Sequence, residues 1–256
     1  MFEIGLQTYT VKKLITTPKT LKETFLLIAD KGVKHIELAI DYLKFPYTED
    51  TFRLIKDTAD QCGIATVSCQ IRYNKVIKDY DKTVKIFNIL DAKNLTISVI
   101  DIKLLLKGYE GIKAFCNNLN ALYDRLSLDG ISLGHHNHHY EFINLDGTTV
   151  MDIMADNFKG KFVLDTYWIA RGGVNHLVLL EKLKGRVDIL HLRDYKLKFK
   201  KFDLLGTDAE AGAGNLPFKE IIGKAIQCGA KYGMIEQSTS EPLESLTKSY
   251  NYLTKL

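Results

Sequence analysis

Four of the seven histidines in the chain lie close together, in the segment LGHHNHH at residues 133–139. Imidazole is the most common metal-ligating side chain and can also move protons near neutral pH. Because side chains alternate across a strand, His136 and His138 can share one face, while His135 and His139 turn away. The segment could also be a polar turn with one or two structural hydrogen bonds. Four histidines in five residues nevertheless favour a metal site or a proton-transfer site.

Carboxylate and imidazole groups also follow apolar residues at three later points in the chain. Asp165 follows Phe-Val-Leu, His191 lies within the run ILHL, and Glu236 follows Gly-Met-Ile. A buried glutamate needs a partner, and a metal ion is the simplest one. Asp165 could instead cap a helix, and His191 taken alone could be a structural histidine. Arg193 follows His191 on the same face and could hold a substrate oxygen or pair with a carboxylate.

The chemistry that these groups suggest is metal-assisted proton transfer. Imidazole and carboxylate ligands without cysteine favour an open catalytic site over a closed structural one. We leave the metal open among Mn²⁺, Zn²⁺, Co²⁺, Fe²⁺, Ni²⁺ and Mg²⁺. Such a metal can hold two adjacent sugar oxygens, polarise a carbonyl and stabilise an enediolate. A metal-bound carboxylate or an adjacent histidine could then move the proton.

A recurring unit of β-rich run, loop, amphipathic stretch and glycine must position these residues. The predicted strands are residues 2–7, 34–39, 64–70, 95–100, 131–136, 161–165, 187–192 and 232–236. The predicted helices cover about 18–31, 48–62, 75–90, 108–128, 148–157, 174–184, 216–228 and 242–256. Thr17 and Pro18 look like the N-cap and first position of the first helix. Glycines such as Gly32 fit the position after a helix, where positive φ is needed.

Strict alternation of strands and helices favours a parallel sheet, and eight units in 256 residues match a single (β/α)8 TIM barrel of the α/β class. An open doubly wound sheet would usually carry a glycine-rich turn after an early strand, whereas Gly212 and Gly214 lie late in the chain. We therefore predict one domain over residues 1–256. The carboxyl ends of barrel strands form one mouth. The residues predicted there are Gln7, Glu37, Gln70, Asp101, His136, His138, Asp165, His191 and Glu236.

Composition places further limits on the function. The net charge of +4 is mild, so we interpret the local cluster of Lys196, Lys198, Lys200 and Lys201 as a solvated loop. The four cysteines are interpreted as reduced thiols, and no signal peptide is seen, so we expect a cytoplasmic protein. We expect a small sugar or polyol as the partner, no nucleic acid and no membrane. Assembly into a homo-oligomer is left open.

Several of these runs together resemble a known superfamily. The runs GVKHIELA, LGHHNHHYEF, FVLDTYWIARGG, ILHLRDY and YGMIEQ, in that order, are similar to the xylose isomerase-like TIM barrels. This superfamily groups sugar phosphate isomerases/epimerases with inosose dehydratases and with the endonuclease-IV type of repair enzyme (AP endonuclease family 2). The resemblance covers nearly the whole chain and is specific for the superfamily but not for the substrate.

The resemblance implies a metal site at the ends of four strands. In the sugar-epimerase branch a divalent metal is held by Glu, Asp, His and Glu at the ends of strands five to eight, and the last three match Asp165, His191 and Glu236. His136 takes the place of the first glutamate and becomes the fourth expected ligand. This departure replaces one member of the glutamate pair that transfers protons in the epimerases. Trp168 stands where many relatives place a histidine, and it could be a wall for sugar stacking or plain packing at the rim.

We expect a metal-dependent isomerase or epimerase of carbohydrate metabolism that acts on a sugar or keto-sugar. Glu236 and His136 are the expected catalytic residues, with His138 as a second candidate for the proton transfer. The expected substrate contacts are Glu37, His138, Trp168 and Arg193. Glu37 could instead support a metal ligand. The glycine turn at residues 212–218 is expected to border the substrate.

Three other functions remain open. A keto-sugar or inosose dehydratase or lyase would use the same groups and expel a β-oxygen. A non-catalytic sugar-binding barrel would have lost its metal. A DNA-repair endonuclease is the least favoured alternative, because its three-metal cluster needs more ligands and a duplex-sized basic footprint.

Overall fold

Eight parallel strands form a closed barrel in the computed structural model, which describes residues 2–197 and 206–256. These strands are β1 (Glu3–Gln7), β2 (His35–Ala39), β3 (Ala65–Ile71), β4 (Asn94–Ile97), β5 (Ser132–His136), β8 (Lys161–Asp165), β9 (Val187–Leu192) and β12 (Tyr232–Ile235). They lie around the ring in chain order, and β12 pairs with β1. The predicted TIM barrel is therefore confirmed.

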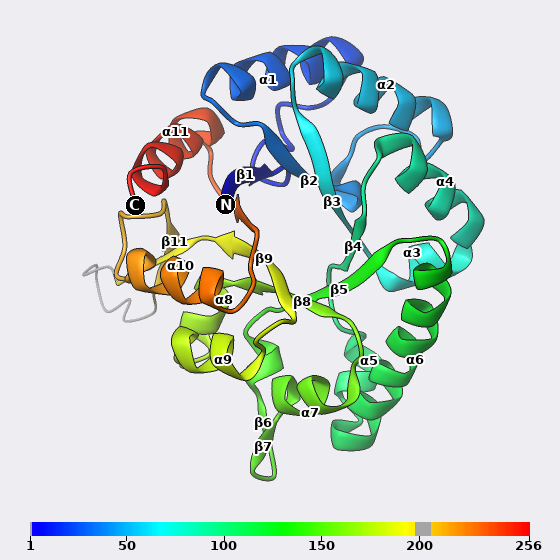
Figure 1. Cartoon of the computed structure of the whole chain (residues 1–256), viewed down its shortest axis with the longest axis vertical. Helices are drawn as coiled ribbons and strands as arrows, with labels where there is room; N and C mark the ends of the chain where they lie inside the picture. Colours follow the sequence, from blue (N-terminus) through cyan, green and yellow to red (C-terminus); the bar gives the residue numbers. More distant parts are fainter. Residues whose placement is uncertain (1, 198–205) are drawn as a thin grey trace.

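Helices surround the barrel on its outside, as Figure 1 shows for a view into the ring of strands. In the described residues the helices are α1 (Pro18–Asp30), α2 (Glu49–Gln61), α3 (Tyr73–Lys78), α4 (Tyr80–Leu90), α5 (Ile102–Leu105), α6 (Gly108–Leu128), α7 (Val150–Asn157), α8 (Thr166–Arg171), α9 (His176–Lys182), α10 (Phe218–Gln227) and α11 (Pro242–Leu253). The helix after each strand carries the chain back to the other end of the barrel, so that the next strand runs parallel to the last.

The ends of α1 show how the local sequence sets these elements. Thr17 is the N-cap, and its hydroxyl accepts from the backbone of Thr20 while the Thr20 side chain accepts from the backbone of Thr17. Pro18 occupies the first turn, where its missing N–H costs no hydrogen bond. Gly32, just past the helix, has a φ of +92°, which a side chain would disfavour.

The apolar core lies in two places. Large buried side chains such as Phe25 of α1 and Phe162 of β8 belong to the main cluster, which packs between strands and helices. A small second cluster of Val163, Ile189 and Met234 comes from three strands. Val163 follows Phe162 on β8, and successive side chains of a strand point to opposite faces. Because Phe162 faces the helices, Val163 and its cluster lie inside the barrel, and we call them the inner cluster.

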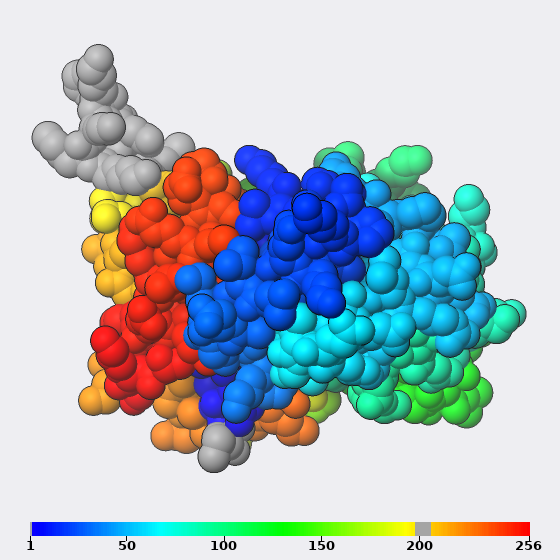
Figure 2. Space-filling model, turned by 90° about the horizontal axis from the view of Figure 1, so that it is seen from above, coloured from blue at the N-terminus to red at the C-terminus, as the bar shows by residue number. Residues whose placement is uncertain are grey.

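The first and last strands close the ring. Leu6 of β1 pairs with Ile235 of β12 in a parallel ladder. The hydroxyl of Tyr250 in α11 donates to the carbonyl of Gly32 at 2.7 Å. In Figure 2 the red C-terminal segment accordingly lies against the blue N-terminal segment. The mouth of the barrel is therefore a complete ring to which both halves of the chain contribute.

The connecting segments differ from the sequence prediction. The helix expected over 75–90 is wrong as one element, because the chain breaks at Asp79 between α3 and α4. The short helices α5 and α8 were not expected. Two hairpins were also missed: β6 (Asn144–Leu145) with β7 (Thr148–Thr149), and β10 (Asp194–Lys196) with β11 (Thr207–Ala209).

Two further expectations concern surface and membrane. Lys198, Lys200 and Lys201 of the predicted basic cluster lie outside the described residues. In the part of the chain that the structure describes, no helix is both long enough and apolar enough to cross a bilayer.

Candidate metal centre

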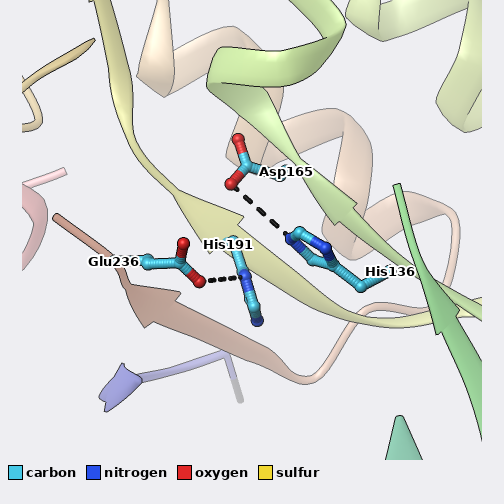
Figure 3. Close-up of side chains that lie close together, drawn as sticks. All are labelled: His136, Asp165, His191 and Glu236. Atoms are coloured by element: carbon cyan, nitrogen blue, oxygen red, sulfur yellow. Dashed lines mark ion pairs between the residues drawn. The ribbon is translucent and has the colours of Figure 1, made fainter. Parts of the chain in front are cut away.

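Four side chains meet at the mouth of the barrel, as Figure 3 shows. His136 ends β5, Asp165 ends β8, His191 lies on β9, and Glu236 directly follows β12. One ligand atom of each lies within 4.8 Å of those of the others, and all four residues are buried. These are the four metal ligands that the sequence predicts, and the structure brings all four together.

The strand pattern explains this convergence. Asp165, His191 and Glu236 each lie two positions after a member of the inner cluster, namely Val163, Ile189 and Met234. Residues two apart on a strand point to the same face, so the polar layer stands directly above the apolar one. In the ladder, Asp165 pairs with His191 and Met234 pairs with His191. Parallel pairing thus fixes Asp165 beside His191 and places Glu236 two residues beyond the ladder partner of His191.

Asp165 has one oxygen engaged and one oxygen free for a ligand. Its Oδ1 accepts from the backbone N–H of Trp168 at 3.0 Å, which makes Asp165 the N-cap of α8. Its Oδ2 lies 3.7 Å from His136 Nε2 and has no hydrogen-bond partner among the residues that the structure describes. The side chain of Asn137 also accepts from the Asp165 backbone N–H at 3.0 Å. The capping interpretation and the ligand interpretation of Asp165 are therefore compatible.

His191 is oriented by two carboxylates. Its Nε2 donates to Glu37 Oε1 at 2.7 Å, and both side chains are fully buried. Its Nδ1 lies 2.9 Å from Glu236 Oε2 but without the alignment of a hydrogen bond. A carboxylate behind an imidazole fixes the ring and raises its basicity as a metal ligand. The structure thus places Glu37 behind His191 as a supporting carboxylate. This is one of the two roles that the sequence left open for Glu37.

The buried charges shift the pKa values of the cluster in different directions. Burial opposes ionisation of His191, but the carboxylates of Glu37 and Glu236 outweigh it and raise the pKa of His191 to about 10. Burial, reinforced by the charge of His191, lowers the pKa of His136 to about 3. Burial raises the pKa of Asp165 to about 6, against the opposing charge of Arg193. Although burial alone would raise it, His191 holds the pKa of Glu236 well below its usual range.

The donor set fits a divalent cation. Within residues 2–197 and 206–256, the buried atoms without a hydrogen-bond partner include both ring nitrogens of His136, Nδ1 of His191 and Oδ2 of Asp165. Unpaired buried polar atoms are costly, so several of them around one point need a shared partner. Two imidazoles and two carboxylates suit Zn²⁺, Mn²⁺, Fe²⁺ or Co²⁺, and a site with carboxylates can also take Mg²⁺. His136, Asp165, His191 and Glu236 could therefore hold a metal.

Arg193 forms one wall beside the cluster. Its Nη1 lies 3.6 Å from Glu236 Oε1, and its Nη2 donates to Asp208 at 2.9 Å and to Ser238 at 3.2 Å. The guanidinium also lies 5.4 Å from the ring centroid of Trp168. Asp208 was not selected from the sequence, because it reaches Arg193 only through the β10–β11 hairpin. The hairpin thus fixes the guanidinium next to Glu236.

Aromatic rings form a second wall. His138 lies 4.8 Å from His136 and 5.3 Å from Trp168, between ring centroids. Burial, reinforced by His136, lowers the pKa of His138 to about 4, so this ring is neutral at pH 7. His139, which was expected to turn away, instead stacks on Trp168 with ring centroids 5.2 Å apart. His135 does turn away, because its Nε2 contacts the buried Glu141 at 2.9 Å.

Three other predicted mouth residues lie outside the cluster of four. Gln7 donates to Gln70 at 3.0 Å, so these amides bond to each other. The carboxylate of Asp101 accepts from the backbone of Lys103 and caps α5.

Two buried carboxylates that hold the surrounding loops were missed. Asp194 accepts four backbone N–H groups at 2.8–3.0 Å; they belong to Tyr195, Gly212, Gly214 and Leu216. Glu141 accepts from the backbone of His138 at 2.8 Å and contacts His135. The Gly212–Gly214 turn could have indicated an anion partner, since successive backbone N–H groups form such cradles. Here the anion is a side chain of the protein itself.

Comparison with known proteins places the fold. No protein-family model matches the sequence, and no curated protein does. A sugar phosphate isomerase/epimerase from Parabacteroides distasonis is 20% identical, with a TM-score of 0.78 over 98% of this chain and 93% of that one. The probable 3-DHS dehydratase of petrobactin synthesis from Bacillus anthracis is 11% identical, with a TM-score of 0.71 over 99% of both chains. A xylose isomerase-like TIM barrel protein from Mycobacterium smegmatis, in complex with magnesium, is 11% identical, with a TM-score of 0.71 over 100% of this chain and 96% of that one. Together with the ring of eight strands, these likenesses show that the chain has the fold of the xylose isomerase-like TIM barrels.

Proposed function

We propose that the protein is a divalent-metal-dependent isomerase or epimerase that moves a proton on a sugar or keto-sugar through an enediolate. The observation that carries this proposal is the set of four buried ligand-type side chains within 4.8 Å of one another at the barrel mouth. A bound divalent metal would supply Lewis acidity toward a carbonyl and an adjacent hydroxyl of the substrate. The sugar phosphate isomerase/epimerase of the same fold supports this reaction class.

Glu236 and His136 are the proposed proton carriers. Glu236 is ionised over the whole physiological range, so its carboxylate is in the proton-accepting form. A bound metal would supply the acidity of the substrate C–H that so weak a base requires. His136 is neutral, so when one ring nitrogen faces a metal the other would carry an N–H that it can give. The two lie within the same cluster but come from different strands, β5 for His136 and the end of β12 for Glu236. The strands β8 and β9 lie between these two in the ring. This separation suits removal and return of a proton at two positions of one substrate.

The walls of the site suit a polyhydroxylated molecule. Arg193 offers a guanidinium that is already held in place by Asp208 and Ser238, so little side-chain entropy is lost when it binds a substrate oxygen. Trp168 and His138 offer aromatic faces, which can pack against the C–H face of a sugar ring. The neutral ring of His138 can also donate or accept a hydrogen bond.

A dehydratase or lyase is the second candidate. It is favoured by His136, which stands where a glutamate would complete a two-carboxylate epimerase pair. A neutral imidazole can give its proton to a departing β-oxygen, which is the step that distinguishes elimination from epimerisation. The probable 3-DHS dehydratase from Bacillus anthracis has the same fold. Product analysis separates the two reactions, because only elimination releases water from the substrate.

The proton-transfer proposal is tested by exchange of solvent deuterium into a substrate panel of 3-keto-sugars, ketohexoses and inososes. We expect Glu236→Gln to reduce exchange by a factor of about 10² to 10⁴, since that is the usual contribution of a general base. The matched control is Glu220→Gln, which changes an exposed glutamate in the first turn of α10. Equal exchange in wild type and Glu236→Gln would exclude Glu236 as the base.

The metal proposal is tested without any substrate. We expect protein purified without chelator to contain about one divalent metal per chain, and we expect its removal to lower the melting temperature. Adding the metal back at 100 times its dissociation constant should stabilise the fold by about 2.7 kcal/mol. Asp165→Asn should remove most of that stabilisation, whereas Asp91→Asn, an exposed residue, should keep it. Near-zero metal content together with no thermal response to Mn²⁺, Zn²⁺ or Mg²⁺ would contradict the proposal.

A further inference from the structure

A cavity opens at the mouth between the loop after β1 and the loop after β12. It has a volume of about 270 Å³, and its lining residues are Tyr9, Thr10, Lys12, Lys13, Gln237, Ser238 and Thr239. We call it the Lys12 pocket. Small-molecule sites usually have volumes of about 300–1,000 Å³, so this pocket suits one end of a substrate and not a whole sugar derivative.

The two walls of the Lys12 pocket are tied together. The Thr10 hydroxyl accepts from the backbone N–H of Gln237 at 3.0 Å, which joins the β1 loop to the β12 loop. The Gln237 side chain in turn donates to the carbonyl of Ala209 at 2.8 Å. Both Thr10 and Gln237 are buried. The pocket is therefore preformed, which reduces the ordering cost of binding.

The lining of the Lys12 pocket is cationic and rich in hydroxyl groups. Lys12 Nζ lies 3.1 Å from the ring centroid of Tyr9 and 4.6 Å from that of Tyr42, so the aromatic faces hold the ammonium in place. Within the described residues, neither Lys12 nor Lys13 has an acidic partner at ion-pair distance, and no acidic residue lines the pocket. Burial raises the pKa of Tyr9, but hydrogen bonds from Lys12 and Ser238 outweigh it, and this pKa lies below its usual range.

The Lys12 pocket adjoins the metal centre. Ser238 lines the pocket and accepts from Arg193, whose other nitrogen lies 3.6 Å from Glu236 Oε1. The carboxylates nearby are already engaged: Asp208 pairs with Arg193 and accepts from the Ser238 backbone. In the described part of the chain, the positive charge of Lys12 thus has no acidic partner, and Ser238 and Arg193 connect its pocket to Glu236.

We propose that the Lys12 pocket receives an anionic end of the substrate, a phosphate or carboxylate group, while the carbonyl end lies at His136, Asp165, His191 and Glu236. This inference rests on the proposed function, because it assumes that the same molecule spans both places. Lys12 supplies the charge, and the hydroxyls of Tyr9 and Ser238 supply donors. The substrate class is then a sugar phosphate or a sugar acid and not a neutral sugar.

The test measures anion binding by calorimetry on the metal-loaded protein at constant ionic strength, with inorganic phosphate and acetate as the probes. We compare wild type with Lys12→Met and with a control, Lys34→Met. Lys34 precedes β2 at the other end of the barrel, is exposed and has no acidic partner among the described residues. The two variants lose the same charge, so a general electrostatic effect would appear in both. Melting curves of both variants check that the fold is intact.

We expect wild type and Lys34→Met to bind phosphate at millimolar concentrations and Lys12→Met to bind it roughly tenfold more weakly, as for loss of one charged hydrogen bond. If Lys12-dependent binding is stronger for phosphate than for acetate, the substrate class is a sugar phosphate. If it is stronger for acetate, the substrate class is a sugar acid. Absence of binding in wild type, or equal binding in Lys12→Met and Lys34→Met, would overturn the inference. The titration is repeated after metal removal, which keeps the two proposals apart. If Lys12-dependent anion binding persists in a protein that shows neither metal binding nor deuterium exchange, only the proposed function has failed.

Discussion

At the scale of single residues, Asp194 shows how a buried charge can hold a loop. It is fully buried, and its two oxygens together accept four backbone N–H groups. A Cβ atom at Gly214 would collide with its carboxylate, so only glycine lets this turn approach so closely. Because Asp194 follows Arg193, the same contacts fix the wall of the candidate metal centre.

We expect Asp194→Asn to lower the free energy of unfolding by about 3 kcal/mol. The amide keeps the shape of the carboxylate, but its NH2 group cannot accept, which leaves buried N–H donors of the Gly212 turn unpaired. Urea denaturation of the purified variant measures the loss. Asp91→Asn serves as the control, since Asp91 is exposed and has a φ of 52°, which asparagine tolerates. Equal stability of the two variants would show that the cradle contributes little.

The sequence predicted the ligand-type residues better than the residues that support them. Asp165 and Glu236 follow apolar triplets, so their place at a strand end could be read from the alternation of the strand. Asp194 and Glu141 have no such signal, because their partners are backbone groups or side chains in loops whose course the sequence does not reveal. Glu37 was selected, but only the distance to His191 distinguishes a supporting carboxylate from a substrate contact.

At the scale of elements, α7 begins with a reciprocal cap and an inter-helix ion pair. Thr149 and Asp152 each accept from the backbone N–H of the other, and Asp152 also accepts from Lys182 of α9 at 2.6 Å. Burial raises the pKa of Asp152, but the bonds from Lys182 and Thr149 outweigh it, so this pKa lies below 3.8. The ionised carboxylate therefore stabilises both helix and helix contact.

We expect Asp152→Asn to cost about 0.5 kcal/mol at pH 7, a small value because the pair is partly exposed. Since the folded pKa of Asp152 lies below the unfolded one, the stabilisation is fully present above about pH 3.8 and is lost as pH falls through the folded pKa. Urea denaturation of wild type and variant at several pH values from 7 to 3 follows the difference. Asp156→Asn, an exposed aspartate of the same helix, should show none. A difference that disappears already near pH 6 would contradict this assignment.

Elements with strong end signals were predicted closely, and short elements were not. The bounds of α6, β8 and β9 agree with the sequence prediction, because each lies between clear turn signals and has a regular apolar pattern. The break between α3 and α4 was missed, since the apolar period continues across Asp79. The hairpins have strands of only two or three residues, too short for alternation to show.

At the scale of the whole molecule, the barrel is built in layers. Val163, Ile189 and Met234 fill the interior below the polar layer, so packing there sets the height and direction of the strand ends. A change in the apolar layer should therefore be felt by the metal centre above it.

We expect Met234→Ala to destabilise the fold by about 2–5 kcal/mol, as is usual when a large buried side chain leaves a cavity. It should also weaken metal binding, since Glu236 lies two residues away on the same strand face. Urea denaturation and metal titration measure the two effects. Ile226→Ala on α10 is the control, because Ile226 is 50% exposed. A Met234→Ala variant as stable as the control would show that the inner layer does not support the strands.

The pairing of β1 with β12 also has a consequence for biosynthesis. The Thr10 hydroxyl contacts the carbonyl of Ile235, 225 positions away, and Glu236 follows directly. A ribosome releases the amino-terminal strands first, so β1 and β9 carry open hydrogen-bonding edges until β12 has been translated. The nascent chain can form helices and neighbouring strand pairs early, but it acquires its last ligand and its sealed ring in the same late step. A chain that stalls before β12 should therefore be a client for chaperones and proteases.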